Sequence, residues 1–392
     1  MFGSMFIGLS GMNAYSAGLR QVSNNITNLN SSGYRASTLG FGDIFSGGTQ
    51  GVSYMNSGSR GGGSGVNLSD LRLDFSQGEL RQSERDLDLA VSGNGFLVLE
   101  HDGQYSYART GQFEVDAEGF IVLAGTDYRL TVLDDQGRPQ SLSIDNYRTN
   151  RPSGTTRVAF SDNLSSTATE MTIPDVRVFG SDGSEALWTL TFSREETVAD
   201  EWTLVVTDQD GEEVGTETLR FSNGLIDPTT TELTFSQPDD GISVIFDFSS
   251  GVTSFSSGSV STLRTSDVDG FGMGELTSLR VNAEGHIELS YTNEQTEDLG
   301  GVTMADFRDP QGLVQSSGGL FTYDSAQGVD YLDADSERVG TVLSGRLENS
   351  NVDLSKEFGD LILVQRGYQA SSQIVSVSND MIQQLFGITG RG

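Results

Sequence analysis

Both ends of this chain carry apolar residues at intervals of seven. This pattern predicts a helix at each end, with an apolar stripe that has to pack against another surface. Near the N-terminus the stripe holds two sets three residues apart: Met5, Met12, Leu19 and Ile26, then Gly8, Tyr15, Val22 and Leu29. Residues 5–29 are therefore expected to form a helix of about four heptads, weakened by its glycines. Its other face carries amides and hydroxyls, and Arg20 is the only charged residue among the first thirty.

The C-terminal segment has the same periodicity. Its stripe consists of Leu354, Leu361, Tyr368, Val375 and Ile382, completed by Val364 and Leu385 and widened by Phe358 and Phe386. Asp353 is predicted to cap the start of this helix, because its carboxylate can accept free backbone N–H groups of the first turn. The helix is predicted to end near Phe386-Gly387, where glycine suits a C-terminal cap.

A single apolar stripe is most often covered by the helix's own domain. Two stripes at opposite ends of one chain, both low in charge, instead favour pairing with each other or with neighbouring copies. The predicted fold is multidomain, with the terminal helices paired as a coiled-coil-like inner domain. The expected polymer-interface residues are Met5, Met12, Tyr15, Leu19, Val22, Ile26, Leu29, Leu354, Phe358, Leu361, Val364, Tyr368, Val375, Ile382 and Leu385.

The net charge differs between the two ends of the chain and its middle. The net charge is -32, from 23 basic and 55 acidic residues. The net charges of residues 1–70 and 343–392 are equal and opposite, so the whole excess of acidic residues lies in residues 71–342. This balance disfavours nucleic-acid binding and docking on an anionic membrane, and no apolar run approaches the roughly 18 residues of a membrane span. The first ten residues lack the basic start of a cleaved export signal, so export would need another route.

The middle of the chain has a sequence pattern that is typical of antiparallel β-structure. Short β-rich runs such as 96–99, 120–123, 202–206 and 244–246 alternate with Asp-Gly or Asn-Gly pairs, which favour tight hairpins. The six pairs lie at 102–103, 182–183, 210–211, 223–224, 240–241 and 269–270. The expected domains are 1–30 with 354–392 (inner helical), 31–70 (extended linker), 71–145 with 271–353 (middle β) and 146–270 (outer β).

Catalytic and metal-binding patterns are weak. The adjacent carboxylates at 195–196, 212–213 and 239–240 would point to opposite faces of a strand. The acidic run 333–337 resembles the start of a calcium loop but has Arg338 at the glycine position and Ser344 at the twelfth. With no cysteine and only two histidines, we expect no cofactor, no metal site and no enzyme activity. An extracellular β-rich carbohydrate-active enzyme or adhesin is the alternative from a different class.

Three motifs, in order along the chain, carry a resemblance to a known family. The first is Gly8-Leu9-Ser10-Gly11-Met12-Asn13-Ala14 with Val22 to Asn28 and Gly33-Tyr34-Arg35. The second is Leu87 to Phe96 with Tyr107 to Phe113, and the third is Asn349 to Leu354 with Gln365 to Ala370. Together they resemble the bacterial flagellar rod and hook proteins. Arg35 stands where lysine is common, and Gly367 where a helix-favouring residue is usual.

The resemblance implies an architecture and a role. Terminal helices would form the inner tube of a helical homopolymer, with β-domains outside. The length and the extra 146–270 segment favour the hook branch, whose curved hollow tube acts as a universal joint between rod and filament; a distal rod component is the alternative. The implied partners are further copies of the chain, rod, hook-cap and hook-filament junction proteins, and the flagellar type III export apparatus. The implied location is the extracellular hook of the basal body.

An uncharged helix face suits the wall of a channel through which unfolded subunits pass, because it would bind segments of neither charge. The channel-facing candidates are Asn13, Ser16, Gln21, Asn24 and Asn28. This assignment is a hypothesis that depends on the tubular polymer implied above.

Overall fold

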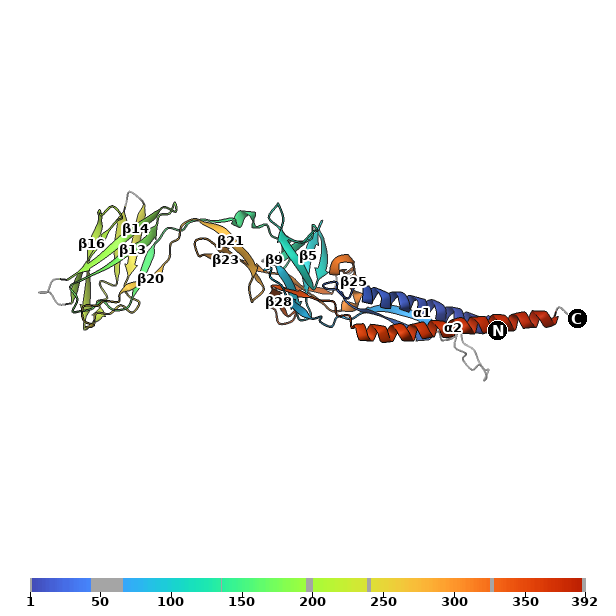
Figure 1. The fold of residues 1–392 in the computed structure, drawn as a ribbon. Coiled ribbons are helices and arrows are strands. Elements are labelled where there is room, and N and C mark those ends of the chain that lie inside the picture. Colours follow the sequence, from blue (N-terminus) through green and yellow to red (C-terminus); the bar gives the residue numbers. More distant parts are fainter. Residues whose placement is uncertain are drawn as a thin grey trace, which may run out of the picture. The chain divides into compact units, whose positions relative to one another are not determined.

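The computed structural model describes residues 2–43, 66–134, 136–194, 200–237, 241–324 and 328–389. The described chain is mainly β, with one long helix near each terminus (Figure 1). This agrees with the predicted multidomain, β-rich fold class. Two compact units can be distinguished: unit 1 comprises Met1–Ile144, Leu279–Glu288 and Asp298–Gly392, and unit 2 comprises Asp145–Ser278 and Leu289–Glu297.

The helices α1 (Phe2–Thr27) and α2 (Leu354–Thr389) lie side by side in unit 1 (Figure 1). Asp353 caps α2 as predicted, because its Oδ1 accepts from the backbone N of Ser355 (2.8 Å) and of Lys356 (3.2 Å). The predicted end near Phe386-Gly387 is wrong, since α2 continues through Gly387 to Thr389. A glycine costs a helix only about 1 kcal/mol, which is too little to stop it by itself.

A two-stranded antiparallel sheet contacts α1. Strands β1 (Ser37–Asp43) and β2 (Val66–Leu73) pair with a register shift between Leu39 and Phe41. Both strands overlap the segment 31–70, which the sequence predicts to be an extended linker and whose residues 44–65 lie outside the described residues. Strand β3 (Leu80–Gln82) pairs with β29 (Arg346–Glu348), directly before α2.

The largest sheet of unit 1 follows the order β25-β26-β6-β5-β9-β8-β7-β4-β28. Its strands are β4 (Asp88–Ser92), β5 (Phe96–His101), β6 (Gln104–Ala108), β7 (Thr110–Val115), β8 (Ile121–Leu123), β9 (Arg129–Leu133), β10 (Pro139–Ser141), β24 (Met304–Phe307), β25 (Val314–Gln315), β26 (Leu320–Thr322), β27 (Val329–Leu332) and β28 (Thr341–Ser344). Short 3-10 helices occupy Ile144–Tyr147, Pro310–Gly312 and Ser317–Gly319. Apolar residues such as Leu89, Leu97, Phe113 and Met304 form its core.

A separate four-stranded sheet has the order β11-β21-β22-β23. Its strands are β11 (Thr149–Asn150), β21 (Gly274–Val281), β22 (His286–Tyr291) and β23 (Thr296–Gly301). Along β22 every second residue, Ile287, Leu289 and Tyr291, is buried, as expected for a strand with one covered face.

Unit 2 contains two further sheets around one apolar core. The five-stranded sheet runs β13 (Glu170–Phe179), β14 (Glu185–Ser193), β15 (Glu201–Thr207), β16 (Glu213–Ser222) and β17 (Leu225–Ile226). The four-stranded sheet has the order β18 (Glu232–Gln237), β19 (Ile242–Asp247), β12 (Arg157–Ser161) and β20 (Arg264–Val268). Both sheets contribute to the core, which includes the fully buried Trp188, Trp202, Phe192 and Phe246.

Most of the predicted turns join consecutive antiparallel strands. The pairs at 102–103, 182–183, 210–211 and 223–224 each connect two neighbouring strands, and Gly241 precedes β19, whereas Asp240 lies outside the described residues. Asp102 and Gly103 both have positive φ, as a tight primed turn requires. The hairpin predicted at 269–270 is wrong: Asp269 Oδ1 instead accepts from the backbone N of Thr156 (2.8 Å) and Arg157 (2.9 Å), beside the start of β12.

Candidate functional site

Glycines bring the two terminal helices into close contact. A Cβ atom on Gly8 would lie 2.8 Å from Val375 Cγ2, and one on Gly11 would lie 2.6 Å from Ser371 Oγ. On α2, a Cβ on Gly367 would lie 2.4 Å from Cζ of Tyr15. The absence of side chains at these three positions is therefore what lets the helices approach. The glycines that weaken the helical propensity of each segment serve the packing between them.

The helix pair covers only part of the predicted stripes. Val22 and Val364 are buried, whereas Met5, Leu354 and Phe358 are exposed. The half-buried members are Met12, Tyr15, Leu19, Ile26, Leu29, Leu361, Tyr368, Val375 and Ile382. The side chain of Leu385 lies outside the described residues. Whether these positions form a polymer interface stays a prediction, but the single chain leaves most of them partly open to water.

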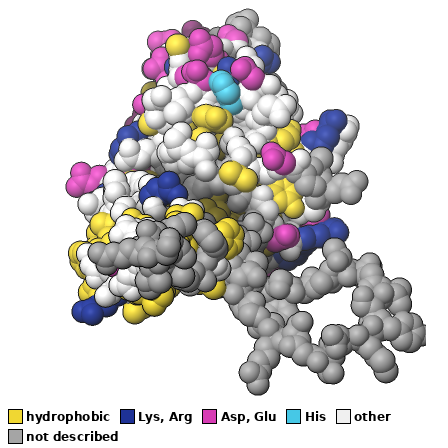
Figure 2. All heavy atoms as spheres, turned by 90° about the vertical axis from the view of Figure 1, so that its right-hand side faces the viewer, with side chains coloured by type: hydrophobic (Ala, Val, Ile, Leu, Met, Phe, Trp, Pro, Cys, Tyr) yellow, Lys and Arg dark blue, Asp and Glu magenta, His cyan; other side chains and the backbone are white. Residues whose placement is uncertain are grey.

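Further apolar side chains that the heptad pattern missed are exposed on the same two helices. Leu363 is 68% exposed and Ile362 is 54% exposed. The others are Phe6, Ile7, Leu9, Ile374, Val377 and Met381. Figure 2, which looks at the end of the molecule that carries the helices, shows hydrophobic side chains gathered around them. A helix with apolar side chains on several faces is typically buried, so this surface requires a cover that the described residues of one chain do not supply.

The proposed channel residues are in different environments. Asn13 and Asn24 are exposed, whereas Ser16, Gln21 and Asn28 are half-buried. Gln21 Nε2 donates to Ser37 Oγ and to Asn25 Oδ1 (3.3 Å), so this amide is engaged within the chain. Asn28 Nδ2 donates to the carbonyl oxygen of Asn24 (2.9 Å). Asn13 and Asn24 therefore have the side chains best placed to face an open space.

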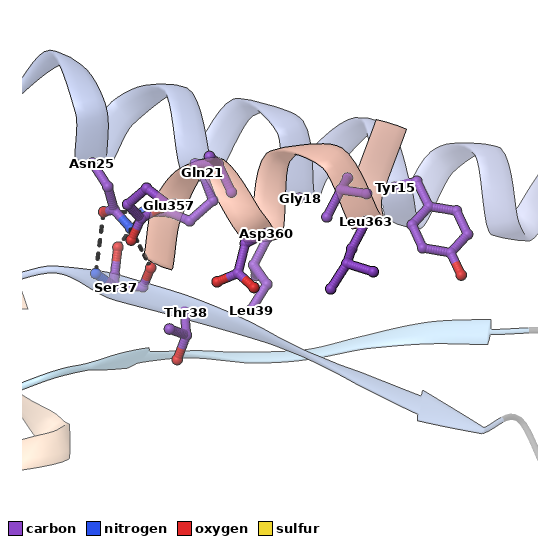
Figure 3. Close-up of a pocket in the computed structure, with 12 residues that line it drawn as sticks. Tyr15, Gly18, Gln21, Asn25, Ser37, Thr38, Leu39, Glu357, Asp360 and Leu363 are labelled. Atoms are coloured by element: carbon purple, nitrogen blue, oxygen red, sulfur yellow. Dashed lines mark hydrogen bonds between the residues drawn. The ribbon is translucent and has the colours of Figure 1, made fainter. Parts of the chain in front are cut away.

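Asn25 connects α1, α2 and β1 where α1 ends and α2 begins, a place called here the root of the helix pair (Figure 3). Its Nδ2 donates to Glu357 Oε1 (2.9 Å) and to the carbonyl oxygen of Ser37 (2.9 Å). Its Oδ1 accepts from the backbone N of Ser37 (3.2 Å) and from the hydroxyl of Tyr34 (3.1 Å). These bonds satisfy a buried amide, and they border a groove of about 340 Å³ between the helices and β1.

Glu357 is the second buried group in this network. Burial raises the pKa of its carboxyl above the ordinary value, and the hydrogen bond from Asn25 opposes that rise. Nearby Asp360 and Asp353 raise this pKa further, whereas Lys356 lowers it. A carboxylate at the root of the helix pair is therefore held mainly by an amide, which compensates a buried charge less well than a cation does.

A buried ionic cluster lies under the helix root. Arg35 NH2 contacts Glu348 Oε1 at 2.8 Å, and both side chains are fully buried. Arg109 Nε lies 3.6 Å from Glu348 Oε2. The pKa of the Arg109 guanidinium falls to about 10 because burial disfavours its charge, although Glu348 opposes that effect. Removing one member of such a buried set typically costs about 3–5 kcal/mol, since a charge is left without its partner.

This cluster joins the three sequence motifs. Arg35 comes from the first motif, Arg109 from the second, and Glu348 directly precedes the third. Arg109 NH2 also donates to the carbonyl oxygen of Gly93 (2.6 Å), which belongs to the second motif. Asn351 of the third motif accepts from the backbone N of Ala36 (2.7 Å). The motifs therefore build one junction between the helices and the large sheet of unit 1.

The sequence motifs contain Arg35 and Arg109 without indicating their role, and no pattern in the sequence predicts a role for Asn25, Glu348 or Glu357. Asn25 belongs to the uncharged face of amides and hydroxyls that the sequence predicts for the N-terminal helix, and the heptad pattern does not distinguish it from the exposed amides of that face. Among the described residues, no group of three His, Cys, Asp or Glu side chains is arranged to hold a metal ion. Within the same residues, neither helix is long and apolar enough to cross a membrane.

Comparisons with known proteins agree with this architecture. The family model "Flagellar hook protein FlgE/F/G D1 domain" matches residues 90–174, and "Flagellar basal body rod FlgEFG protein C-terminal" matches residues 343–388. The flagellar hook protein FlgE of Salmonella typhimurium is 27% identical, covering 97% of this chain and 98% of that protein. FlgE of Brucella suis is 28% identical, covering 99% of each.

A solved structure has a similar fold. The crystal structure of the Helicobacter pylori flagellar hook protein FlgE2 matches with a TM-score of 0.51 and 12% identity, covering 69% of this chain and 99% of that chain. The β-rich fold, the two terminal helices and the matched family models define a flagellar axial protein of the rod and hook class.

Within that class, the relatives that match over nearly the full length are hook proteins. The chain is similar to flagellar hook proteins over nearly its whole length, and it is a structural subunit of the flagellar hook. The family is a structural one, and a hook subunit assembles with copies of itself.

Proposed function

We propose that copies of this chain assemble into a curved hollow tube through α1 and α2. The observation that carries this proposal is the apolar surface left open on both helices, including Ile362 and Leu363. Burying such surface contributes about 25 cal/mol per Å² removed from water, so many exposed side chains together supply a large driving force. The coiled-coil-like inner domain would comprise residues 1–30 and 354–392.

The remaining proposed domains follow the order expected from the sequence. Residues 71–145 and 271–353 would form the middle β-domain, 146–270 the outer β-domain, and 31–70 the connection to the helices. Because the described part of a single chain does not cover the helices completely, they would be only marginally ordered in the free subunit. Their ordering would then be coupled to the addition of the subunit to the tube.

The tube would work as a joint that transmits torque from rod to filament while it bends. Each line of subunits in a rotating curved tube must lengthen and shorten during every turn, so outer contacts need to slide. Exposed ion pairs such as Arg177–Glu185 and Arg220–Glu201 suit sliding contacts, because each is weak and screened by salt. Cohesion would come mainly from the helices.

The proposed partners are the rod, hook-cap and hook-filament junction proteins, together with the flagellar type III export apparatus. The subunit would reach the extracellular hook through this apparatus. The chain has no cysteine, so it has no thiol that could cross-link during passage and folding outside the cell.

Asn13, Ser16, Gln21, Asn24 and Asn28 are proposed to face the channel of the tube. Asn24 and Asn13 are the best test positions, since both are exposed and Asn24 uses only its backbone carbonyl in the bond with Asn28. Asn24→Asp should slow filament growth several-fold in cells while the purified subunit keeps its fold, as judged by circular dichroism. Filaments of normal length on hooks of the variant would contradict the channel assignment.

Electron microscopy of the purified full chain under polymerising conditions tests the proposal as a whole. Curved hollow tubes are expected. Straight short rods would favour the distal rod component instead, and a protein that stays monomeric under all conditions would contradict assembly through the helices. Of the carboxylate pairs considered for the alternative of an extracellular carbohydrate-active enzyme, 195–196 and 239–240 lie outside the described residues.

A further inference from the structure

We propose that protonated His286 links β22 and β23 to the turn at residues 333–336, and that this link weakens when the imidazole loses its proton. The turn directly follows β27 and is closed by a hydrogen bond from Ser336 N to the carbonyl oxygen of Asp333 (3.0 Å). His286 Nδ1 lies 2.8 Å from Asp298 Oδ2 on β23, and its Nε2 lies 3.8 Å from Asp333 Oδ1. All of these residues belong to unit 1, and the inference is independent of the proposed assembly into a tube.

Only the protonated ring suits both contacts. A charged imidazole carries a hydrogen on each nitrogen, whereas a neutral one has a hydrogen on one nitrogen and a lone pair on the other. In the neutral state one of the two carboxylates would therefore face a lone pair instead of a donor. The attraction to the more distant carboxylate of Asp333 also depends on the positive charge of the ring, since at 3.8 Å it is an ion pair and not a hydrogen bond.

The surrounding charges favour the protonated state. The hydrogen bond with Asp298 raises the pKa of His286 above its ordinary value, and partial burial opposes this rise. The negative charges of Asp298, Asp333 and Asp335 raise this pKa further. The other charged side chains on the adjacent strands and turns are hydrogen-bonded elsewhere or exposed: Arg280, Glu284, Glu288, Glu297, Glu337 and Arg338. His286 therefore offsets the negative charge that Asp298 and Asp333 bring together.

Apolar packing holds the same segments together without any charge. Ala334 is fully buried in the turn, and a Cβ on Gly285 would overlap its methyl group. Ile287 and Ala334 both belong to the apolar core of the large sheet. These contacts do not depend on pH, so the fold should remain intact when His286 loses its proton. The expected response is a local opening of β22 and β23 near the turn, and not the unfolding of unit 1.

The direction of the pH response follows from the raised pKa of His286. A group whose pKa is higher in the folded chain stabilises it fully below the unfolded value, and loses that contribution as the pH rises through the folded value. The side chains of Asp298 and Asp333 are 53% and 37% exposed, so water screens the link. We expect local opening to change by about three- to fivefold, as for a partly exposed ion pair.

Hydrogen exchange of the full chain tests this proposal, because it measures local opening. Mass spectrometry of peptides that cover residues 282–301 gives the exchange rate of β22 and β23. Protection is expressed relative to an unstructured peptide at the same pH, which removes the pH dependence of the exchange chemistry itself. In the natural chain this protection should fall about three- to fivefold between about pH 5 and about pH 9.

Two single variants separate His286 from other titrating groups. His286→Gln carries no charge at any pH, so its protection over residues 282–301 should be low and should vary with pH by less than about 1.5-fold. His101→Gln removes the other of the two histidines and should keep the response of the natural chain. Unchanged protection of the natural chain between the two pH values, or a full pH response in His286→Gln, would overturn the proposal.

Discussion

Gly367 shows how one residue can have opposite effects in a free helix and in a packed one. In the sequence it is a weak helix former within a long predicted helix, with a cost of about 1 kcal/mol relative to Ala. In the structure the ring of Tyr15 occupies the place that a side chain at position 367 would need. Gly367 therefore lowers the intrinsic stability of α2 but allows close contact between α1 and α2.

Gly367→Ala should destabilise the helix pair by about 1–3 kcal/mol, because the added methyl group would overlap Tyr15. Gly359→Ala is the matched control, since no atom lies within 4 Å of a Cβ at that position of the same helix. The control should stabilise the helix by up to about 1 kcal/mol. Far-UV circular dichroism of the full-length subunit should show less helix in the first variant and more in the second; equal gains in both would contradict the packing.

Glu357 makes the helix pair sensitive to pH. Its pKa in the folded chain is raised by burial, so its contribution to stability is complete below the unfolded pKa and is lost as pH rises through the folded value. Wild-type helix content should therefore decrease as the pH rises above the ordinary pKa of a glutamate carboxyl. Glu357→Gln should flatten this decrease and raise helix content at neutral pH.

Asp380→Asn is the control for that measurement, because Asp380 is exposed on the same helix and changes the net charge equally. It should leave the pH dependence of the helix signal unchanged. If both variants flatten the profile to the same extent, general charge repulsion and not the burial of Glu357 determines the pH response.

At the scale of elements, the sequence predicts the structures that follow from local periodicity, but it does not predict contacts between residues that are far apart in the chain. The two helices, many short strands and the hairpins at 102–103 and 223–224 follow from local periodicity and turn chemistry. The hairpin prediction at 269–270 is wrong because an Asp-Gly pair also occurs where an aspartate side chain caps backbone N–H groups, as that of Asp269 does. Such long-range hydrogen bonds have no periodic signature.

The buried junction of Arg35, Glu348 and Arg109 could not be predicted for the same reason. Its members are separated by up to 313 residues, and each of them alone looks like an ordinary charged residue. The motifs that contain Arg35 and Arg109, and the third that follows Glu348, were visible, but their convergence depends on strand pairings such as β3 with β29. The heptad pattern likewise gave one stripe per helix, whereas apolar side chains such as Leu363 extend onto other faces.

Leu363→Asp tests the role of the exposed helix surface. Leu363 is open to water in the single chain, so an aspartate should leave the fold of the subunit intact. In the tube it would place an unpaired charge in an apolar contact, which costs several kcal/mol and should raise the critical concentration for assembly by roughly a hundredfold or more. Sedimentation measures that concentration.

Gln209→Asp introduces the same charge on an exposed turn of unit 2 and should change assembly by less than about threefold. If Leu363→Asp assembles as readily as this control, the surface around Leu363 is not an assembly contact.

At the scale of the whole molecule, charge and apolar surface are segregated. The two ends have almost no net charge and carry the exposed apolar helices, whereas residues 71–342 hold the entire excess of acidic residues. This distribution suits a polymer in which neutral helices supply cohesion and acidic β-structure stays hydrated.

The division of labour between ends and middle is the central claim, and it is tested most directly by a chain that lacks both helices. Residues 31–353 should unfold cooperatively on heating, because the cores of unit 2 and of the large sheet remain. Electron microscopy under conditions in which the full chain forms tubes should show no polymers of this truncated chain. Tubes formed by residues 31–353 alone would contradict the claim that α1 and α2 hold the assembly together.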